Sequence, residues 1–146
     1  DCWRGARPLS AGEDATARLW KLVEESHLVF KGGHRMSIDA AAMVTEDYFL
    51  TGGSDGKLSL GFANKRKPAV SVEQAHGVGA GPRPVDAPIA SASVQGGTSF
   101  TGPHWICSVA AAKGTDLAAS GSHDGYLRFW RVFCGAGGAE RELEQV

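Results

Sequence analysis

The chain has 146 residues and a formal net charge of -1, with 15 Lys and Arg against 16 Asp and Glu. This balance excludes a strongly basic domain that coats nucleic acid by bulk electrostatics, but it leaves room for a local basic patch. Glycine is abundant, with 20 residues or about 14%, roughly twice the average usage. The glycines lie between short apolar runs without a Gly-X-Y period, which predicts many tight turns and an all-β chain.

The cysteines are Cys2, Cys107 and Cys134, an odd number without the C-x-x-C spacing of redox or metal sites. We therefore expect small, buried or half-buried thiols in a reducing, intracellular compartment. No apolar run approaches the ~18 residues of a membrane span, and no signal peptide opens the chain, so no membrane partner is expected. Because the chain begins with Asp1 rather than Met, we expect it to be a fragment.

Three segments of the chain resemble one another: residues 10–20, 51–61 and 120–130. Each starts with a hydroxyl residue, has an Asp at the fifth place and ends in an alternating run. The three Asp residues are separated by 41 and then by 69 positions. The first spacing is that of a four-stranded WD-repeat blade of roughly 40–45 residues, and the second is one such repeat plus an insertion of about 28.

Each segment predicts a β-hairpin. A short apolar strand leads into a Gly/Ser/Asp turn, where Gly supplies positive φ and Asp bonds its own backbone, and an alternating strand follows. Small apolar strands precede two of the hairpins, and outer strands follow them. In chain order, the strands expected outside the first hairpin cover residues 26–30, 37–44, 48–50, 57–61, 68–73, 105–111, 116–119, 126–131 and 140–146.

The predicted fold is all-β, a partial WD40-type β-propeller of about three blades of four antiparallel strands. Residues 1–33 form an incomplete blade (strands b, c and d), residues 34–75 a complete blade, and residues 76–146 a third blade. The third blade carries a Gly/Pro/Ala/Ser-rich insertion at about 77–104, which reads as a mobile loop. Since propellers close with 4–8 blades, we expect an arc with two raw edges that is poorly soluble alone.

The repeats also predict a hydrogen-bonded tetrad in each blade. An Asp accepts from a His, the His engages a strand-b hydroxyl, and the hydroxyl accepts from a strand-c Trp. In the second blade Gly61 stands where the Trp belongs, so one buried indole and its bond are lost. His104 competes with His76 for the third blade. The predicted members are Ser10, Asp14 and Trp20; His34, Thr51 and Asp55; and His76, Ser120, Asp124 and Trp130.

A catalytic interpretation of the same His, Ser and Asp residues is rejected. The trio recurs blade after blade, which structure explains and a single active site does not, and no G-x-S-x-G frames any Ser. The histidines His34, His76, His104 and His123 lack metal-ligand spacing. We therefore expect no enzyme, no metal, no cofactor and no small-molecule substrate.

The stretches between the repeats resemble a known family, the U3 small nucleolar RNA-interacting WD-repeat proteins. The resemblance covers nearly the whole chain apart from the insertion and the last ten or so residues. It rests on residues 20–30, Gly33-His34-Arg35, 37–39, 65–68, 75–77, 105–111, 115–117 and 121–123.

The resemblance implies a non-enzymatic, nucleolar RNA-binding scaffold of the U3 small nucleolar ribonucleoprotein. Such a protein recognises the box B/C region of U3 RNA together with a kink-turn-binding protein. With other small-subunit processome proteins, the particle supports early processing of pre-ribosomal RNA.

RNA binding requires Lys and Arg side chains for the phosphates. We favour Arg35 and the arginines at blade edges. Loop geometry predicts that Arg35 and the 65–67 cluster lie on opposite faces, and the cluster also reads as a solvated loop or a nuclear-import signal. The candidates are Lys31 and Arg35 at the Gly-His turn; Lys65, Arg66 and Lys67; and Arg18, Arg128 and Arg131 on the strands, whose plain alternative is a solvated strand face.

A general protein–protein adaptor, such as a ubiquitin-ligase substrate receptor, is the competing function, because WD propellers serve many roles. Some ligase receptors carry W-D-x-R after strand c. Here Trp20 is followed by Lys21 and Trp130 by Arg131, so the motif is missing.

Overall fold

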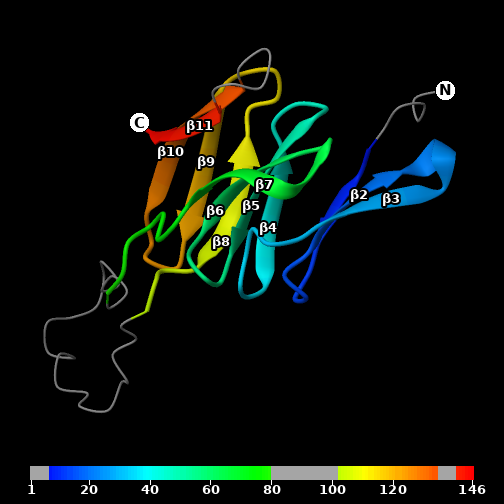
Figure 1. Ribbon diagram of the computed structural model, residues 1–146. Coiled ribbons are helices and arrows are strands. Elements are labelled where there is room, and N and C mark those ends of the chain that lie inside the picture. The colour runs from blue at the N-terminus through cyan, green and yellow to red at the C-terminus, as the bar shows by residue number, and fades with distance from the viewer. Residues whose placement is uncertain (1–6, 80–101, 135–140) are drawn as a thin grey trace, which may run out of the picture.

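A computed structural model describes residues 7–79, 102–134 and 141–146. Three antiparallel sheets follow one another along the chain and stand side by side (Figure 1). The first sheet consists of β1 (Leu9–Ala11), β2 (Ala17–Lys21) and β3 (Ser26–Phe30), with a 3-10 turn at Leu22–Glu24. We call this sheet the first blade.

The second and third blades each have four strands that pair with their neighbours in the chain. Such meanders are the units of a propeller, and the all-β prediction is confirmed. Among the described residues no helix has the length and apolar character to cross a membrane. The second blade consists of β4 (Ile38–Met43), β5 (Tyr48–Gly53), β6 (Leu58–Phe62) and β7 (Lys65–Val72), and the third of β8 (Ile106–Ala111), β9 (Leu117–Ser122), β10 (Leu127–Cys134) and β11 (Arg141–Gln145).

The turns between the second and third strands of the repeats are built alike. Gly56 and Gly125 have φ of 72° and 80°, the left-handed region that glycine adopts without strain. In the first blade Ala15 takes the equivalent place with φ of 57°. The carboxylates of Asp55 and Asp124 accept from the backbone N–H two residues further on, at 3.1 and 2.9 Å. The Asp-Gly pair therefore closes each hairpin locally.

Two apolar clusters between neighbouring blades hold the arc together. The first includes Leu19 and Phe30 of the first blade and Phe49 of the second. The second joins Leu50, Leu58 and Leu60 to Ile106 and Trp130 of the third blade. Strand β4 contacts β1 and β8, and β7 contacts β3 and β11, so the blades are stacked in one orientation. Burying each large side chain contributes about 1.5–3 kcal/mol, which makes these interfaces the main source of stability.

The far side of the third blade exposes an apolar face. Leu117, Leu127, Phe129 and Phe133 are 44%, 68%, 49% and 40% exposed. The register pairs Leu127 with Gly121 and Phe129 with Ala119, so these side chains share one face of the sheet. A further blade would cover this face in a closed propeller.

The structure corrects the predicted start of one strand and describes only the ends of the predicted insertion. Lys65, Arg66 and Lys67 are not a loop: β7 begins at Lys65, three residues earlier than expected, because only Ala63 and Asn64 lie between β6 and β7. Residues 80–101 of the predicted mobile insertion lie outside the described residues. Its two ends are joined by a bridge between Val78 and Pro103.

The prediction of buried cysteines is wrong for Cys107, whose thiol is exposed. The register of β8 against β9 shifts between Ile106 and Ser108. Ile106 points into the core at this irregularity, and the next side chain, Cys107, points away from it. Cys2 and the side chain of Cys134 lie outside the described structure.

Candidate functional site

The third blade contains a four-membered hydrogen-bonded network. The indole N–H of Trp130 donates to Ser120 Oγ at 2.8 Å. Ser120 Oγ lies 2.7 Å from His76 Nε2, and His76 Nδ1 lies 3.1 Å from Asp124 Oδ2. All four side chains are buried. The network ties β9 and β10 to the chain that enters the blade.

The protonation of this network follows from its burial. Burial disfavours the imidazolium and lowers the pKa of His76 below its ordinary value, outweighing the Asp124 carboxylate, which raises it. A neutral His76 with its proton on Nδ1 donates to Asp124 and accepts from Ser120. Burial also acts to raise the pKa of Asp124, but the N–H donors of Tyr126 and His76 outweigh it and hold that pKa low. The carboxylate therefore stays ionised, and the chain of donors is consistent.

The second blade repeats the network with one member missing. His34 Nδ1 lies 3.0 Å from Asp55 Oδ1, and His34 Nε2 lies 2.9 Å from Thr51 Oγ1. Asp55 also accepts from the Arg35 backbone N–H at 2.8 Å. Burial works to raise the pKa of Asp55, but the bonds from His34 and Arg35 outweigh it and keep that pKa below its ordinary value.

The place of the missing indole is filled by Phe49. In the third blade Trp130 lies opposite Ala118, whereas in the second blade Gly61 lies opposite Phe49. A Cβ at Gly61 would come within 3.0 Å of three atoms of the Phe49 ring. Phe49 is 2% exposed and packs edge-on against Phe30 at 4.7 Å between ring centroids. In the third blade the large side chain lies on the third strand, and in the second blade it lies on the second strand. The second blade therefore loses the indole hydrogen bond but keeps a large aromatic ring in the core.

The first blade holds part of the network. Trp20 Nε1 donates to Ser10 Oγ at 2.9 Å, as Trp130 does to Ser120. The carboxylate of Asp14 accepts from the Thr16 hydroxyl at 2.8 Å and pairs with Arg18 at 3.4 Å.

The structure also shows which of the two candidate histidines joins the network of the third blade. His76 takes both partners, whereas His104 is 7% exposed and its Nδ1 has no hydrogen-bond partner among the described residues. The two residues lie side by side in the stem of the insertion, where His104 N–H donates to the Gly77 carbonyl at 3.0 Å.

Three of the predicted RNA-binding residues are engaged within the fold. Arg128 donates to the carbonyls of Ala75 and His76 at 2.9 and 3.3 Å and so closes the entry to its own blade. Arg131 lies 3.5 Å from Asp116, and Arg18 pairs with Asp14. These contacts compete with RNA for the guanidinium groups.

The other five candidates form no ion pair within the part of the chain that the structure describes. Lys31 lies beside Gly33 and His34 of the Gly-His turn, and its backbone N–H also donates to the Arg66 carbonyl at 3.1 Å, so the chain after β3 meets β7 here. Lys31 and Arg66 line the same groove, and Lys65 and Lys67 are exposed on either side of Arg66. We call Lys31, Lys65, Arg66 and Lys67 the basic ridge.

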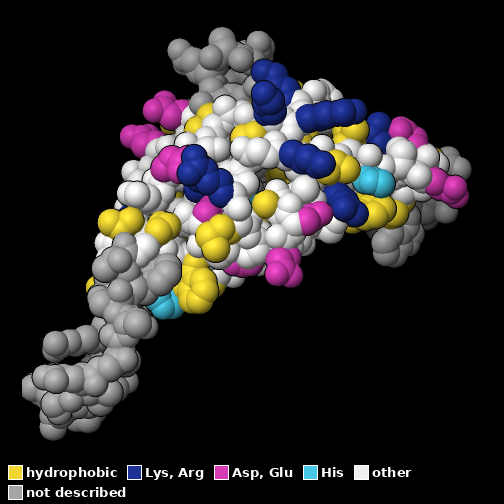
Figure 2. Space-filling model, turned by 60° about the horizontal axis from the view of Figure 1, so that its bottom comes forward, with side chains coloured by type: hydrophobic (Ala, Val, Ile, Leu, Met, Phe, Trp, Pro, Cys, Tyr) yellow, Lys and Arg dark blue, Asp and Glu magenta, His cyan; other side chains and the backbone are white. Residues whose placement is uncertain are grey.

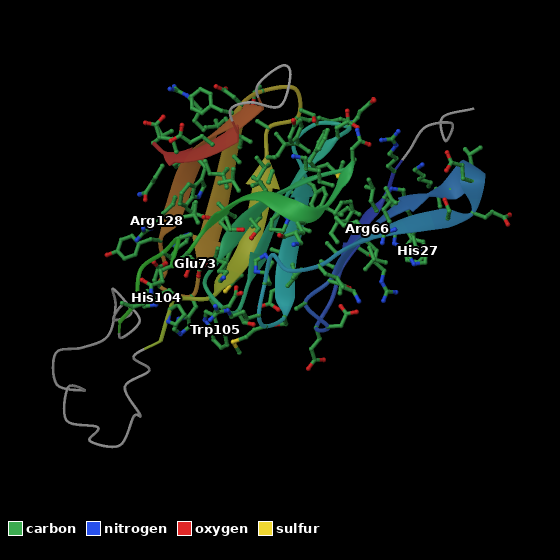
Figure 3. All side chains as sticks on the ribbon, in the orientation of Figure 1. His27, Arg66, Glu73, His104, Trp105 and Arg128 are labelled. Carbon is green, nitrogen blue, oxygen red and sulfur yellow. The ribbon has the colours of Figure 1, made fainter. Side chains whose placement is uncertain are left out.

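The basic ridge borders a groove of about 460 Å³ between β3 and the start of β7. Figure 2 shows Lys and Arg side chains gathered on one part of the surface with few acidic side chains among them. In Figure 3, Arg66 and His27 lie near each other at one end of the arc, and His104 lies at the other. Sequence reasoning missed this groove, since it depends on a contact between two blades.

The described residues contain no group of three or more His, Cys, Asp or Glu that could hold a metal ion. What the arrangement offers is a rigid frame with unpaired cations on its rim.

Comparison with known proteins first defines the class. A model of the WD domain, G-beta repeat family matches residues 96–131. A crystal structure described as that of the RRP9 WD40 repeats superposes with a TM-score of 0.69 at 36% identity, covering 93% of this chain and 36% of that chain. The chain is therefore a WD-repeat protein that forms part of a β-propeller, as predicted.

The particular relatives follow from the sequence. An uncharacterized WD repeat-containing protein of Schizosaccharomyces pombe is 40% identical over 134 residues, which are 83% of this chain and 25% of that protein. U3 small nucleolar RNA-interacting protein 2 of Homo sapiens is 36% identical over 119 residues, 82% of this chain and 21% of that protein. The chain is homologous to U3 small nucleolar RNA-interacting protein 2 over most of its own length, and it spans about a quarter of the length of these curated relatives. The names of these relatives describe WD40 repeats and an interaction with RNA, in line with the non-enzymatic prediction for this chain.

Proposed function

We propose that this chain is part of an RNA-binding scaffold of the U3 small nucleolar ribonucleoprotein. The observation that carries the proposal is the 36% identity with a protein whose name states that it interacts with U3 small nucleolar RNA. In this proposal the complete propeller recognises the box B/C region together with a kink-turn-binding protein. It works in the nucleolus with other small-subunit processome proteins, in the processing of pre-ribosomal RNA.

The geometry supports a scaffold. The buried networks around His34 and His76 fix the entry of two blades, and the apolar clusters lock each blade against the next. Such preorganisation holds the surface side chains in place before RNA arrives, which lowers the ordering cost of binding. The side chains of His76, Ser120 and Asp124, which resemble a catalytic trio, are all used within the third-blade network.

A gel-shift titration of the complete protein tests the proposal. The ligands are a box B/C RNA and an unrelated stem-loop of equal length, each with and without the kink-turn-binding protein. We expect the box B/C RNA to bind at least tenfold more tightly at moderate salt, and the kink-turn-binding protein to strengthen that binding only. Equal affinity for the two RNAs would refute specific recognition, because phosphate contacts alone do not distinguish sequences.

A further inference from the structure

We infer that the basic ridge on the outer rim of the first and second blades binds the phosphodiester backbone of RNA. This inference rests on the proposed function and adds the surface that carries the contact. The ridge is a juxtaposition of residues from two blades, Lys31 after β3 and Lys65–Lys67 in β7.

The first argument is that no carboxylate among the described residues neutralises the charges of the ridge. None of the four ridge side chains forms an ion pair within the described residues, whereas Arg18, Lys21, Lys57 and Arg131 all do. Lys31 and Arg66 line one groove, and Lys65 and Lys67 lie on the other face of the same exposed strand. Like charges this close along the rim repel each other, and an anionic partner or counterions relieve the repulsion. Asp14, the carboxylate that lines the groove with Lys31 and Arg66, is already bonded to Thr16 and Arg18.

The second argument is that the ridge is held in shape. The N–H of Lys31 donates to the Arg66 carbonyl, and Lys65 pairs with Phe62 across the two-residue turn. The register shifts between the pairs Phe62–Lys65 and Leu60–Val70, so this part of β7 leaves β6, and there the Arg66 carbonyl accepts from Lys31, the residue after β3. The backbone is thus fixed on both sides. Such a segment suits a preformed cationic surface better than a nuclear-import signal, which a receptor reads as an extended peptide.

The third argument concerns the kind of anion. The groove beside the ridge is lined by Lys31 and Arg66 and by His27, whose ring lies 4.8 Å from that of Trp20. Three cations, Arg18, Lys31 and Arg66, and the aromatic ring of His27 line this groove with one carboxylate, Asp14. Cations beside an exposed ring suit a sugar–phosphate backbone with its bases more than an acidic peptide. The contacts would be to phosphates, so the ridge positions the RNA and the sequence is read elsewhere.

The experiment is a salt titration of RNA binding by the complete protein and its variants. The test variant combines K31Q, K65Q, R66Q and K67Q. K113Q is the matched control, since Lys113 is an exposed cation in the turn before β9 and pairs with no carboxylate among the described residues. R35Q tests the competing location at the Gly-His turn. Circular dichroism and thermal unfolding check that each variant is folded.

At about 0.15 M salt, counterion release makes each phosphate contact worth roughly four- to fivefold in affinity. We therefore expect R66Q alone to weaken binding about fivefold, and the quadruple variant to weaken it a few hundredfold. The slope of log K against log salt should become shallower by about three units for the quadruple variant. K113Q and R35Q should bind like the wild type.

The outcomes separate the two proposals. Because the ridge contacts phosphates, the quadruple variant should lose the same factor on box B/C RNA and on the unrelated stem-loop. Equal wild-type affinity for both RNAs refutes the proposed function. The wild type can prefer box B/C RNA while the folded quadruple variant keeps the same affinity and salt slope. That result refutes the ridge inference but leaves the proposed function standing. A loss confined to R35Q places the contact at the Gly-His turn and also overturns the ridge.

Discussion

Phe49 and Gly61 form a size-exchanged pair whose energetics can be worked out from the structure. Phe49 is 2% exposed at the interface of the first and second blades, so F49A leaves a buried void and should cost about 3–5 kcal/mol of unfolding free energy. G61W alone cannot fit, because even a Cβ at this position would meet the ring within 3.0 Å. Such overpacking should cost about 3 kcal/mol or more.

The two changes together recreate the arrangement of the third blade, where Trp130 faces Ala118 and bonds Ser120. In the F49A/G61W variant the indole can take the ring's place, with Thr51 as the matching hydroxyl. We therefore expect G61W to destabilise the wild type but to stabilise F49A. The coupling free energy, which is the difference between the two effects of G61W, should therefore be at least about 3 kcal/mol.

The assay is urea unfolding of the complete protein, followed by far-ultraviolet circular dichroism so that the added Trp does not disturb the signal. F49A combined with the distant K113Q serves as the control and should be additive within about 0.5 kcal/mol. If G61W destabilises F49A as much as it destabilises the wild type, the packing argument is refuted.

Three further predictions concern the His76 network, the turn at Ala15 and the exposed apolar face of the third blade. H76Q should lower the unfolding free energy at pH 7, because it removes two buried hydrogen bonds. The pKa of His76 is lowered in the folded protein, so the unfolded chain takes up the proton first as the pH falls through about 6.5, and the wild type loses stability between pH 7 and 5. H76Q lacks this group, so its stability should fall less over the same range. Parallel denaturation curves for the two proteins over this range would contradict it. A15G should raise the unfolding free energy by about 1 kcal/mol, since Ala15 has φ of 57°, and a lower melting temperature would show that the strain is absent. The isolated chain should self-associate in sedimentation through the exposed face of the third blade, and L127K/F129K should reduce this; a monomeric wild type would contradict it.

The sequence predicted the hairpins and network members because they depend on local chemistry. An Asp followed by Gly closes a turn wherever it occurs, and the alternating run that follows has only one choice of inward face. The outer strand at Ser26–Phe30 was also placed correctly. The position of each Asp then fixed the hydroxyl residue of the same blade, four residues earlier in the chain, which bonds the His or the Trp.

What could not be predicted depends on contacts between strands or blades. The choice of His76 over His104 requires knowing how the two ends of the insertion meet, which no spacing shows. The contact of Lys31 with Arg66 joins the outer strands of two blades. The role of Phe49 did leave a signal: two residues before the hydroxyl, the second repeat has Phe49 where the third has the small Ala118, and the reversed sizes at Gly61 and Trp130 match it.

The central claim is that these blades belong to a protein that binds U3 small nucleolar RNA. Ultraviolet crosslinking in living cells, followed by purification of the complete protein and sequencing of the attached RNA, tests it most directly. The account predicts that U3 RNA is the most enriched RNA, with crosslinks in and beside box B/C, and that the basic-ridge variant loses crosslinks while remaining folded. Purification of the protein with ubiquitin-ligase subunits and without U3 RNA would contradict the account and favour the adaptor function.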